Sequence, residues 1–239
     1  MSRAARLFAT IVFTCLPAGV DAATGTIEIA SDERRRGISW SQSRATARAA
    51  LSIQPTTTFR IDGAVTALRR SRRHRGADTV VDLGAGWQDR SGPVRYDAGV
   101  VAHLFAGGAG RLDYAEVQAG LGSTIGPADF GLSASYAPRQ NAIGGEVLYL
   151  AADARVAVVG TPFSIVGGLG RSSGAVRDPI RAARLRPENR YMDWRLGVEH
   201  VSGPVTASLL YLGTDLSTPQ SPTTRGSGDT LILRLTLTL

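Results

Sequence analysis

The sequence is poor in the residues on which many enzyme sites depend, with one cysteine, three histidines and no lysine among 239 residues. Cys15 falls in a segment that we predict to be removed on export. We therefore expect no disulfide, no thiol nucleophile and no cysteine-based metal site in the exported protein. Phosphate-binding loops, metal-ligand clusters and hydride-cofactor fingerprints are also missing. The sequence therefore predicts no cofactor and no catalytic residues.

Long apolar runs are scarce as well. Downstream of residue 23 no window holds the roughly 18 consecutive apolar residues that a membrane-spanning helix needs. An apolar run does occur at residues 7–20, with arginines before it and small residues after it, which is the pattern of a secretory signal peptide. We predict a signal peptide over residues 1–22 and one exported domain over residues 23–239.

Apolar and polar residues alternate along most of the exported chain, as in β-strands with two chemically different faces. Short connections after even-numbered segments and mostly longer ones after odd-numbered segments are typical of outer-membrane barrels. The fold prediction is all-β, an antiparallel transmembrane up-and-down β-barrel of about twelve strands in the bacterial outer membrane. The predicted strands are residues 25–32, 44–53, 57–68, 78–88, 94–106, 112–123, 128–137, 144–158, 161–171, 190–202, 204–213 and 228–239.

Aromatic residues occur at predicted strand ends with the parity of the apolar face, where a barrel meets the two membrane interfaces. A soluble β-sandwich with aromatics ending its strands is the alternative, and it does not explain this two-sided order. The predicted girdle is Phe59, Trp87, Tyr96, Phe130 and Phe163 at the periplasmic end, and Tyr136, Trp194 and Tyr211 at the outer end.

The opposite face carries charges of both signs in nearly equal number. A soluble core could not bury so many ionised groups without a large desolvation penalty, so we expect them to face a lumen. Glu146 breaks parity with Asp153, which predicts a bulge or a later start in the eighth strand. The predicted lumen charges are Glu28, Arg44, Arg48, Arg60, Asp62, Asp82, Arg95, Asp97, Glu116, Asp153, Arg155, Asp193, Arg195, Glu199 and Arg234.

The formal net charge is +7, and all 27 basic residues are arginine. Nucleic acid is not an expected partner, because the chain is exported. Charged loops are often simply solvated, but arginine also binds phosphate through bidentate hydrogen bonds, so we expect membrane lipid and lipopolysaccharide as partners. The arginines of the predicted external loops are Arg34, Arg35, Arg36, Arg69, Arg70, Arg72, Arg73 and Arg75.

Residues 31–39, Ser-Asp-Glu-Arg-Arg-Arg-Gly-Ile-Ser, resemble the Ser-Asp-Tyr-Arg-Phe-Arg-Gly-Ile-Ser opening of the TorF-like porin family. Segments at residues 113–121, 131–136, 191–194 and 211–215 are similar to later segments of that family. Glu33 and Arg35 stand here in place of the family's aromatic residues. The resemblance implies an outer-membrane barrel with a channel function, and it implies no catalytic residues.

Three functions remain open at this point. A passive pore for small hydrophilic solutes or ions is favoured by glycines at predicted lumen positions such as Gly84, Gly120 and Gly197, although twelve strands lie between filled and open barrels. A closed structural or partner-binding barrel is the second. The third is an outer-membrane lipid hydrolase that would use a Ser–His pair at His103. In each case the barrel-assembly machinery is an expected partner.

Overall fold

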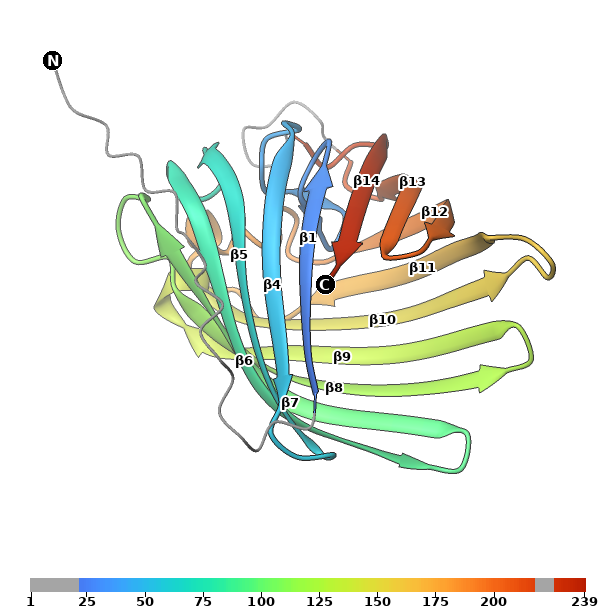
Figure 1. The fold of residues 1–239 in the computed structure, drawn as a ribbon. Helices are drawn as coiled ribbons and strands as arrows, with labels where there is room; N and C mark the ends of the chain where they lie inside the picture. Colours follow the sequence, from blue (N-terminus) through green and yellow to red (C-terminus); the bar gives the residue numbers. More distant parts are fainter. Residues whose placement is uncertain (1–21, 218–225) are drawn as a thin grey trace, which may run out of the picture.

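The computed structural model describes residues 22–217 and 226–239, which form one closed antiparallel barrel (Figure 1). The predicted signal peptide lies outside the described residues, apart from Ala22, which begins the first strand. Strands that follow one another around the barrel are neighbours in sequence, and β1 closes the ring by pairing with both β14 and β4. The prediction of an all-β barrel of about twelve strands is confirmed.

The twelve barrel strands run close to the predicted ranges. For β7 the predicted range, 94–106, is also the observed one. The strands are β1 (Ala22–Ala30), β4 (Thr46–Gln54), β5 (Phe59–Ser71), β6 (Ala77–Ser91), β7 (Val94–Ala106), β8 (Tyr114–Ile125), β9 (Ala128–Gln140), β10 (Gly145–Ala157), β11 (Phe163–Ser173), β12 (Tyr191–Ser202), β13 (Val205–Thr214) and β14 (Thr230–Thr238).

Alternation along each strand separates an apolar outer wall from a polar inner one. In β14, Leu231 and Leu233 are 64% and 65% exposed, whereas Ile232 between them is fully buried. Leu83 on β6 and Leu121 on β8 are exposed in the same way. Water disfavours so much exposed apolar surface, so the outer wall fits a hydrocarbon environment. Within the described residues, no helix is long and apolar enough to cross a membrane.

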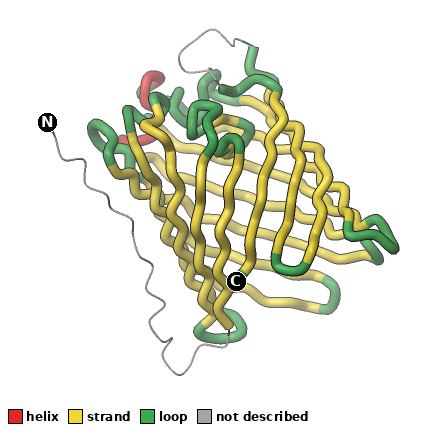
Figure 2. The backbone as a smooth tube through the Cα atoms, turned by 45° about the horizontal axis from the view of Figure 1, so that its top comes forward, coloured by secondary structure: helices red, strands yellow, loops and turns green. Residues whose placement is uncertain are grey.

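The connections differ between the two ends of the barrel (Figure 2). At one end, here called the short-turn end, pairs such as Gly92-Pro93 and Gly203-Pro204 join strands directly. Both glycines have a positive φ, which the first position of a tight hairpin turn requires. The other end, the long-loop end, carries residues 31–45 and 174–190 among its connections.

Four short elements lie in the connections of the long-loop end: β2 (Arg34–Arg35), β3 (Ile38–Ser39), η1 (Asn141–Ile143) and α1 (Pro179–Ala182). Strands β2 and β3 pair with each other across a turn at Arg36 and Gly37, both of which have positive φ. This is the pattern of a type I′ turn, which matches strand twist. We call residues 33–40 the inner hairpin.

The base of the inner hairpin is organised by one carboxylate. Asp32 accepts hydrogen bonds from the hydroxyls of Ser39 and Ser41 at 2.6 and 2.8 Å, and from Arg34 Nε at 3.0 Å. The Trp40 amide donates to the Glu33 carbonyl at 2.7 Å, which closes the hairpin. These buried bonds fix the direction in which the hairpin leaves β1.

Apolar residues fill the barrel next to the inner hairpin, at the long-loop end. Trp40 from the hairpin packs with Leu112, Ile143 and Leu185 from three other connections, and Leu68 of β5 joins them. All five side chains are buried. This group is called the cap. It is a hydrophobic core inside the barrel wall, so the lumen is not uniformly polar.

Strand β10 begins with an irregularity. Its pairing with β9 shifts register between Gly145 and Val147, and Glu146 between them accepts a hydrogen bond from Tyr136 Oη at 2.9 Å. Between these two pairs β10 has one residue and β9 has two, Pro138 and Arg139, so the extra residue of the bulge lies in β9. Glu146 has the same outward parity as Leu150 and lies beside the outward Tyr136, so it is not a lumen charge, and the bulge predicted for the eighth strand lies in the facing strand β9.

Candidate functional site

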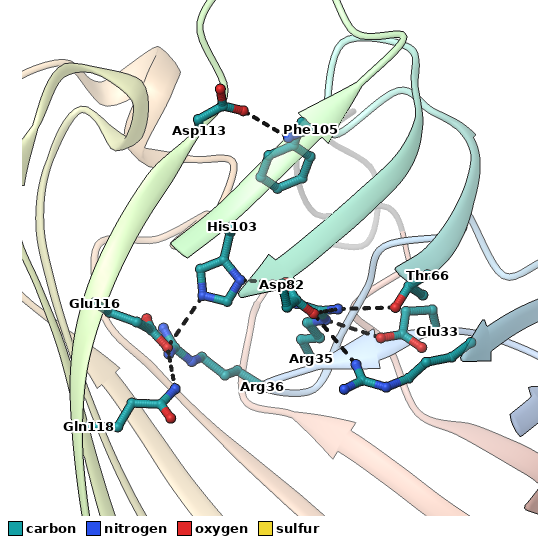
Figure 3. Close-up of polar contacts among 11 residues, drawn as sticks. Glu33, Arg35, Arg36, Thr66, Asp82, His103, Phe105, Asp113, Glu116 and Gln118 are labelled. Carbon is teal, nitrogen blue, oxygen red and sulfur yellow. Dashed lines mark hydrogen bonds and ion pairs between the residues drawn. The ribbon is translucent and has the colours of Figure 1, made fainter. Parts of the chain in front are cut away.

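Two arginines of the inner hairpin reach carboxylates on the barrel wall (Figure 3). Arg35 Nη2 donates to Asp82 Oδ2 at 2.8 Å, and its Nη1 donates to Asp82 Oδ1 at 3.2 Å. Arg36 Nη2 donates to both oxygens of Glu116, at 2.7 and 2.8 Å. Charge-assisted bonds of this kind are the strong ones. Together with His103 these residues form what we call the charge cluster.

Burial alone would lower the pKa of the Arg35 and Arg36 guanidinium groups, but the facing carboxylates raise it by more, so the net change is a rise. Asp82 raises the pKa of Arg35, and Glu116 raises the pKa of Arg36. Both arginines therefore keep their charge throughout the accessible pH range. The hairpin is attached to the wall by two permanent cations.

His103 lies between the two carboxylates. Its Nδ1 is 2.7 Å from Asp82 Oδ1, its Nε2 is 3.7 Å from Glu116 Oε1, and its ring packs on Tyr114 with centroids 4.5 Å apart. Its neighbours are thus carboxylates and an aromatic ring. The geometry of His103 is that of a bridging group in the charge cluster, and it offers no support for the Ser–His pair of a hydrolase.

A Ser–His hydrogen bond does occur elsewhere. Ser71 Oγ and His74 Nδ1 are 3.0 Å apart, but both side chains are fully buried, so no substrate reaches them. The His74 ring also stacks on Phe105 and lies 4.4 Å from Trp40. His74 therefore belongs to the packing of the cap.

Aromatic groups extend the attachment across the barrel. The Arg35 guanidinium lies over the Trp40 ring at 4.4 Å, and that of Arg36 over Tyr149 of β10 at 4.7 Å. Tyr191 of β12 donates to the Arg36 carbonyl at 2.9 Å. The inner hairpin thus contacts β6 and β8 on one side and β10 and β12 on the other. It crosses the lumen.

A cavity of about 510 Å³, lined by charged and apolar residues, adjoins the charge cluster. Arg35, Arg36 and Trp40 line it at the long-loop side, and wall residues such as Arg60 and Asp97 line it toward the short-turn end. We call it the inner cavity. A second cavity, the outer cavity, has a volume of about 570 Å³ and lies among the long loops.

The inner hairpin and the cap separate the two cavities. Ile38 and Leu185 line the inner cavity, whereas their sequence neighbours Ser39 and Arg184 line the outer one. The partition is therefore thin.

The structure places the predicted lumen charges on inward positions, with one exception. Arg44 precedes β4, is exposed and donates to the carbonyl oxygens of Ser41 and Arg69, so its assignment to the lumen is wrong. The assignment failed because β4 starts later than predicted. The paired lumen charges are Arg48 with Asp82, Arg60 with Asp62, Arg95 with Asp129, Arg155 with Glu199, Arg195 with Asp153, and Arg234 with Glu28.

Asp193 and Asp97, the remaining predicted lumen charges, also face inward. Asp193 accepts a hydrogen bond from Tyr149 Oη at 3.1 Å, and Asp97 lines the inner cavity. Asp97 also covers Gly120, where an added Cβ would collide with its carboxylate. Glycine at this lumen position makes room for a charged neighbour, which differs from the open space that we expected there.

The predicted external arginines fall into two groups. Arg34, Arg35 and Arg36 form ion pairs with carboxylates and belong to a hairpin that folds into the barrel, so their prediction as arginines of an external loop is wrong. For Arg35 and Arg36 the reason is that their partners, Asp82 and Glu116, lie far away in sequence, whereas Arg34 pairs with the nearby Asp32. Arg69 and Arg70 end β5 in an exposed bulge, and Arg72, Arg73 and Arg75 lie at the long-loop end next to the outer cavity.

The predicted girdle residues lie near strand ends on the outer wall. Phe59, Trp87, Phe130 and Phe163 are 41 to 47% exposed at the short-turn end, and Trp87 packs against Tyr96 with centroids 5.4 Å apart. At the long-loop end, Tyr136, Trp194 and Tyr211 lie on outward positions, and Tyr211 donates to Asp229 at 2.6 Å.

Sequence reasoning missed Trp40, Tyr149, Tyr191 and Arg184. Trp40 is an aromatic residue in an otherwise polar connection, and that signal could have revealed a buried loop. Nothing local marks Arg184. Within the described residues, His, Cys, Asp and Glu side chains form no group of three or more that could hold a metal ion.

A family model described as "Bacterial protein of unknown function (Gcw_chp)" matches residues 16–237. The sequence matches no curated protein. Among solved structures, the chain is similar to the COG4313 outer membrane channel from Pseudomonas putida F1, with a TM-score of 0.53 and 13% identity over 94% of this chain and 96% of that chain. It is also similar to the KdgM porin, with a TM-score of 0.55 and 7% identity over 91% and 98%.

At such low identities the two similarities show the fold alone, which is that of an outer-membrane β-barrel. The resemblance to TorF-like porins stays a prediction, because the matched family carries a different description.

Proposed function

The chain belongs to the Gcw_chp family of bacterial proteins of unknown function, and we propose that it is an outer-membrane channel for passive diffusion of small hydrophilic solutes or ions. The observation that carries the proposal is the inner cavity, lined by charged side chains of both signs and enclosed by strands whose outer faces are apolar. The similarity of residues 31–39 to TorF-like porins supports the same function.

Exposed charges inside the barrel support a wet lumen. The side chains of Arg195 and Asp153 are 49% and 43% exposed although both face inward, and that of Arg95 is 43% exposed. Ions held in a dry interior would carry a desolvation penalty of several kcal/mol each. Ion pairs that contact water avoid that penalty, and they leave space through which a hydrated solute can pass.

The inner hairpin is the proposed constriction of this path. Its arginines face Asp82 and Glu116, so a solute that passes the hairpin meets positive and negative groups. Charges placed at a constriction decide which solutes pass and how fast. The channel is therefore expected to be narrow for a barrel of twelve strands.

In the proposed orientation the long-loop end faces outside and the short-turn end faces the periplasm, as in bacterial outer-membrane barrels. The rings at both ends, such as Trp87 and Tyr211, would then lie at the two interfaces. The partners in this proposal are membrane lipid and lipopolysaccharide around the wall, and the barrel-assembly machinery during insertion.

A closed structural or partner-binding barrel is the second candidate. The cap favours it, because Trp40, Leu112, Ile143 and Leu185 fill the long-loop end with buried apolar side chains. The thin partition between the two cavities favours the channel instead, since residues adjacent in sequence line the two spaces.

Single-channel recording of the purified protein in a planar bilayer separates the two candidates. A channel gives steady, stepwise openings, and salts whose cation and anion differ in mobility then report its ion preference. A protein that inserts with a β-type circular dichroism spectrum but passes no current would contradict the proposal and favour the closed barrel.

A further inference from the structure

The outer cavity is lined by cations. Its walls come from six connections of the long-loop end, and six arginines line it: Arg72, Arg73, Arg75, Arg111, Arg181 and Arg184. Among the described residues that line it there is no carboxylate. Cations gathered around a concave space focus a positive potential into it.

Arg184 is the most deeply placed of the six, with 6% of its surface exposed. Its Nη2 donates to the carbonyl oxygens of Leu112 at 2.6 Å and Ala142 at 3.2 Å. Its Nε and Nη1, in contrast, have no hydrogen-bond partner among the described residues. Buried charges in proteins are normally paired, so two unused donors on a buried guanidinium are unusual.

The surroundings hold the Arg184 guanidinium in place without neutralising it. Its Cζ lies 5.0 Å from the ring centre of Phe105 and 5.5 Å from that of Tyr114. Its pKa is lowered to about 10, chiefly by burial, which still leaves it charged at neutral pH. A fixed cation with free donors is preorganised for an anion.

Arg73 and Arg181 lie next to Arg184 and add positive charge to the site, though not equally. Arg73 donates from Nη1 to the carbonyl oxygens of Ala183 and Arg184, each at 3.3 Å, which ties it to the same connection. Burial lowers the pKa of Arg73 to about 10 as well. Arg181 contributes less, because it forms an ion pair with Asp178 at 3.2 Å.

We infer that the outer cavity binds an anion bearing phosphate groups, with Arg184 as the innermost donor and the exposed Arg75 and Arg111 as outer contacts. Several guanidinium groups around one space suit the multiple oxygens and high charge of phosphate better than a single carboxylate. One source of the anion is a phosphate-bearing solute that binds in the outer cavity before it reaches the inner hairpin, and this source rests on the proposed channel function. The other source is the phosphate of lipopolysaccharide.

Isothermal titration calorimetry of the purified protein in zwitterionic detergent tests the site, with pyrophosphate as the probe. The variant is Arg75→Gln/Arg111→Gln, which changes exposed residues and leaves the buried Arg184 in place. We expect wild type to bind pyrophosphate saturably. The double variant should bind it about 10-fold or more weakly, because charge-assisted hydrogen bonds are lost. The control is Arg177→Gln. Arg177 is an exposed arginine in the connection that holds Arg184, but it does not line the cavity, so this variant should bind pyrophosphate as wild type does.

A second titration with purified lipopolysaccharide distinguishes the sources. Pyrophosphate binding that the double variant weakens supports a site for soluble anions, and lipopolysaccharide binding weakened by the same variant supports a site for lipid phosphate. Absence of both, or binding equally strong in the double variant and in wild type, overturns the inference. Since calorimetry needs no current, an electrically silent protein that still binds pyrophosphate would refute the channel and keep the site.

Discussion

Removing one partner of the Arg36–Glu116 pair should release the inner hairpin. In Arg36→Met the Glu116 side chain, which is 3% exposed, loses two hydrogen bonds and keeps Gln118 Nε2 at 3.0 Å and His103. Breaking a buried pair in this way costs about 3 to 5 kcal/mol, and we expect the lower end because two partners remain. About 3 kcal/mol is a change of roughly two orders of magnitude in the docking equilibrium of the hairpin.

Trp40 reports on docking. It is 4% exposed, and in a Trp87→Phe/Trp194→Phe background it is the one remaining tryptophan. We expect acrylamide to quench Trp40 weakly in the parent protein. In Arg36→Met, urea should give access to Trp40 at a clearly lower concentration.

Two further variants make the test decisive. Arg36→Met/Glu116→Met removes the buried carboxylate as well, so it should recover most of the loss, because an apolar pair replaces a buried ion pair with little change in stability. Arg44→Gln changes an exposed residue of the same connection, so it should change the free energy of hairpin release by less than about 0.5 kcal/mol and leave the urea midpoint nearly unchanged. A midpoint in Arg36→Met equal to that of Arg44→Gln would refute the reasoning.

Three other outcomes follow from the same geometry. Gly37→Ala should destabilise the hairpin by more than about 1 kcal/mol in the Trp40 quenching assay, because its φ is +74° and an added Cβ would lie 2.7 Å from that of Asp193. Burial and nearby arginines hold the pKa of His74 well below its usual value. Below a pH of about 6.5 His74 is therefore protonated in the unfolded state but neutral in the folded state, so the folded state loses stability as the pH falls. Protection of Trp40 should therefore fall as pH drops from 7 to 5, and His74→Phe should remove that fall. An equal fall in wild type and in His74→Phe would contradict this reasoning. Leu83→Arg on the outer wall should destabilise the barrel in lipid vesicles by about 2 to 4 kcal/mol in a urea titration, whereas equal stability with wild type would contradict a membrane-facing wall.

Alternation along the strands made most of the barrel predictable, because each face of a strand meets a different medium. Leu231, Leu233 and Leu235 face outward for that reason, and Arg234 faces inward to Glu28. The limits of a strand are less certain where a charged residue lies at its end. Arg44 fits the alternation of β4 but belongs to the preceding connection.

The site was less predictable, because it depends on contacts between distant residues. Arg35 and Asp82 are 47 positions apart, and Arg36 and Glu116 are 80 apart. A local pattern of three arginines indicates only a charged loop. The turn at Arg36 and Gly37 indicates a hairpin, but whether it points outward or into the barrel is decided by carboxylates on β6 and β8.

Conductance of the hairpin variant tests the central claim most directly. In Arg35→Gln/Arg36→Gln the hairpin loses both ion pairs with the wall, so the constriction should widen and single-channel steps should be larger than those of wild type in the same bilayer and salt. Arg44→Gln serves as the control and should leave the step size unchanged. Equal steps in wild type and in the double variant would contradict the account, because the inner hairpin would then not limit the path.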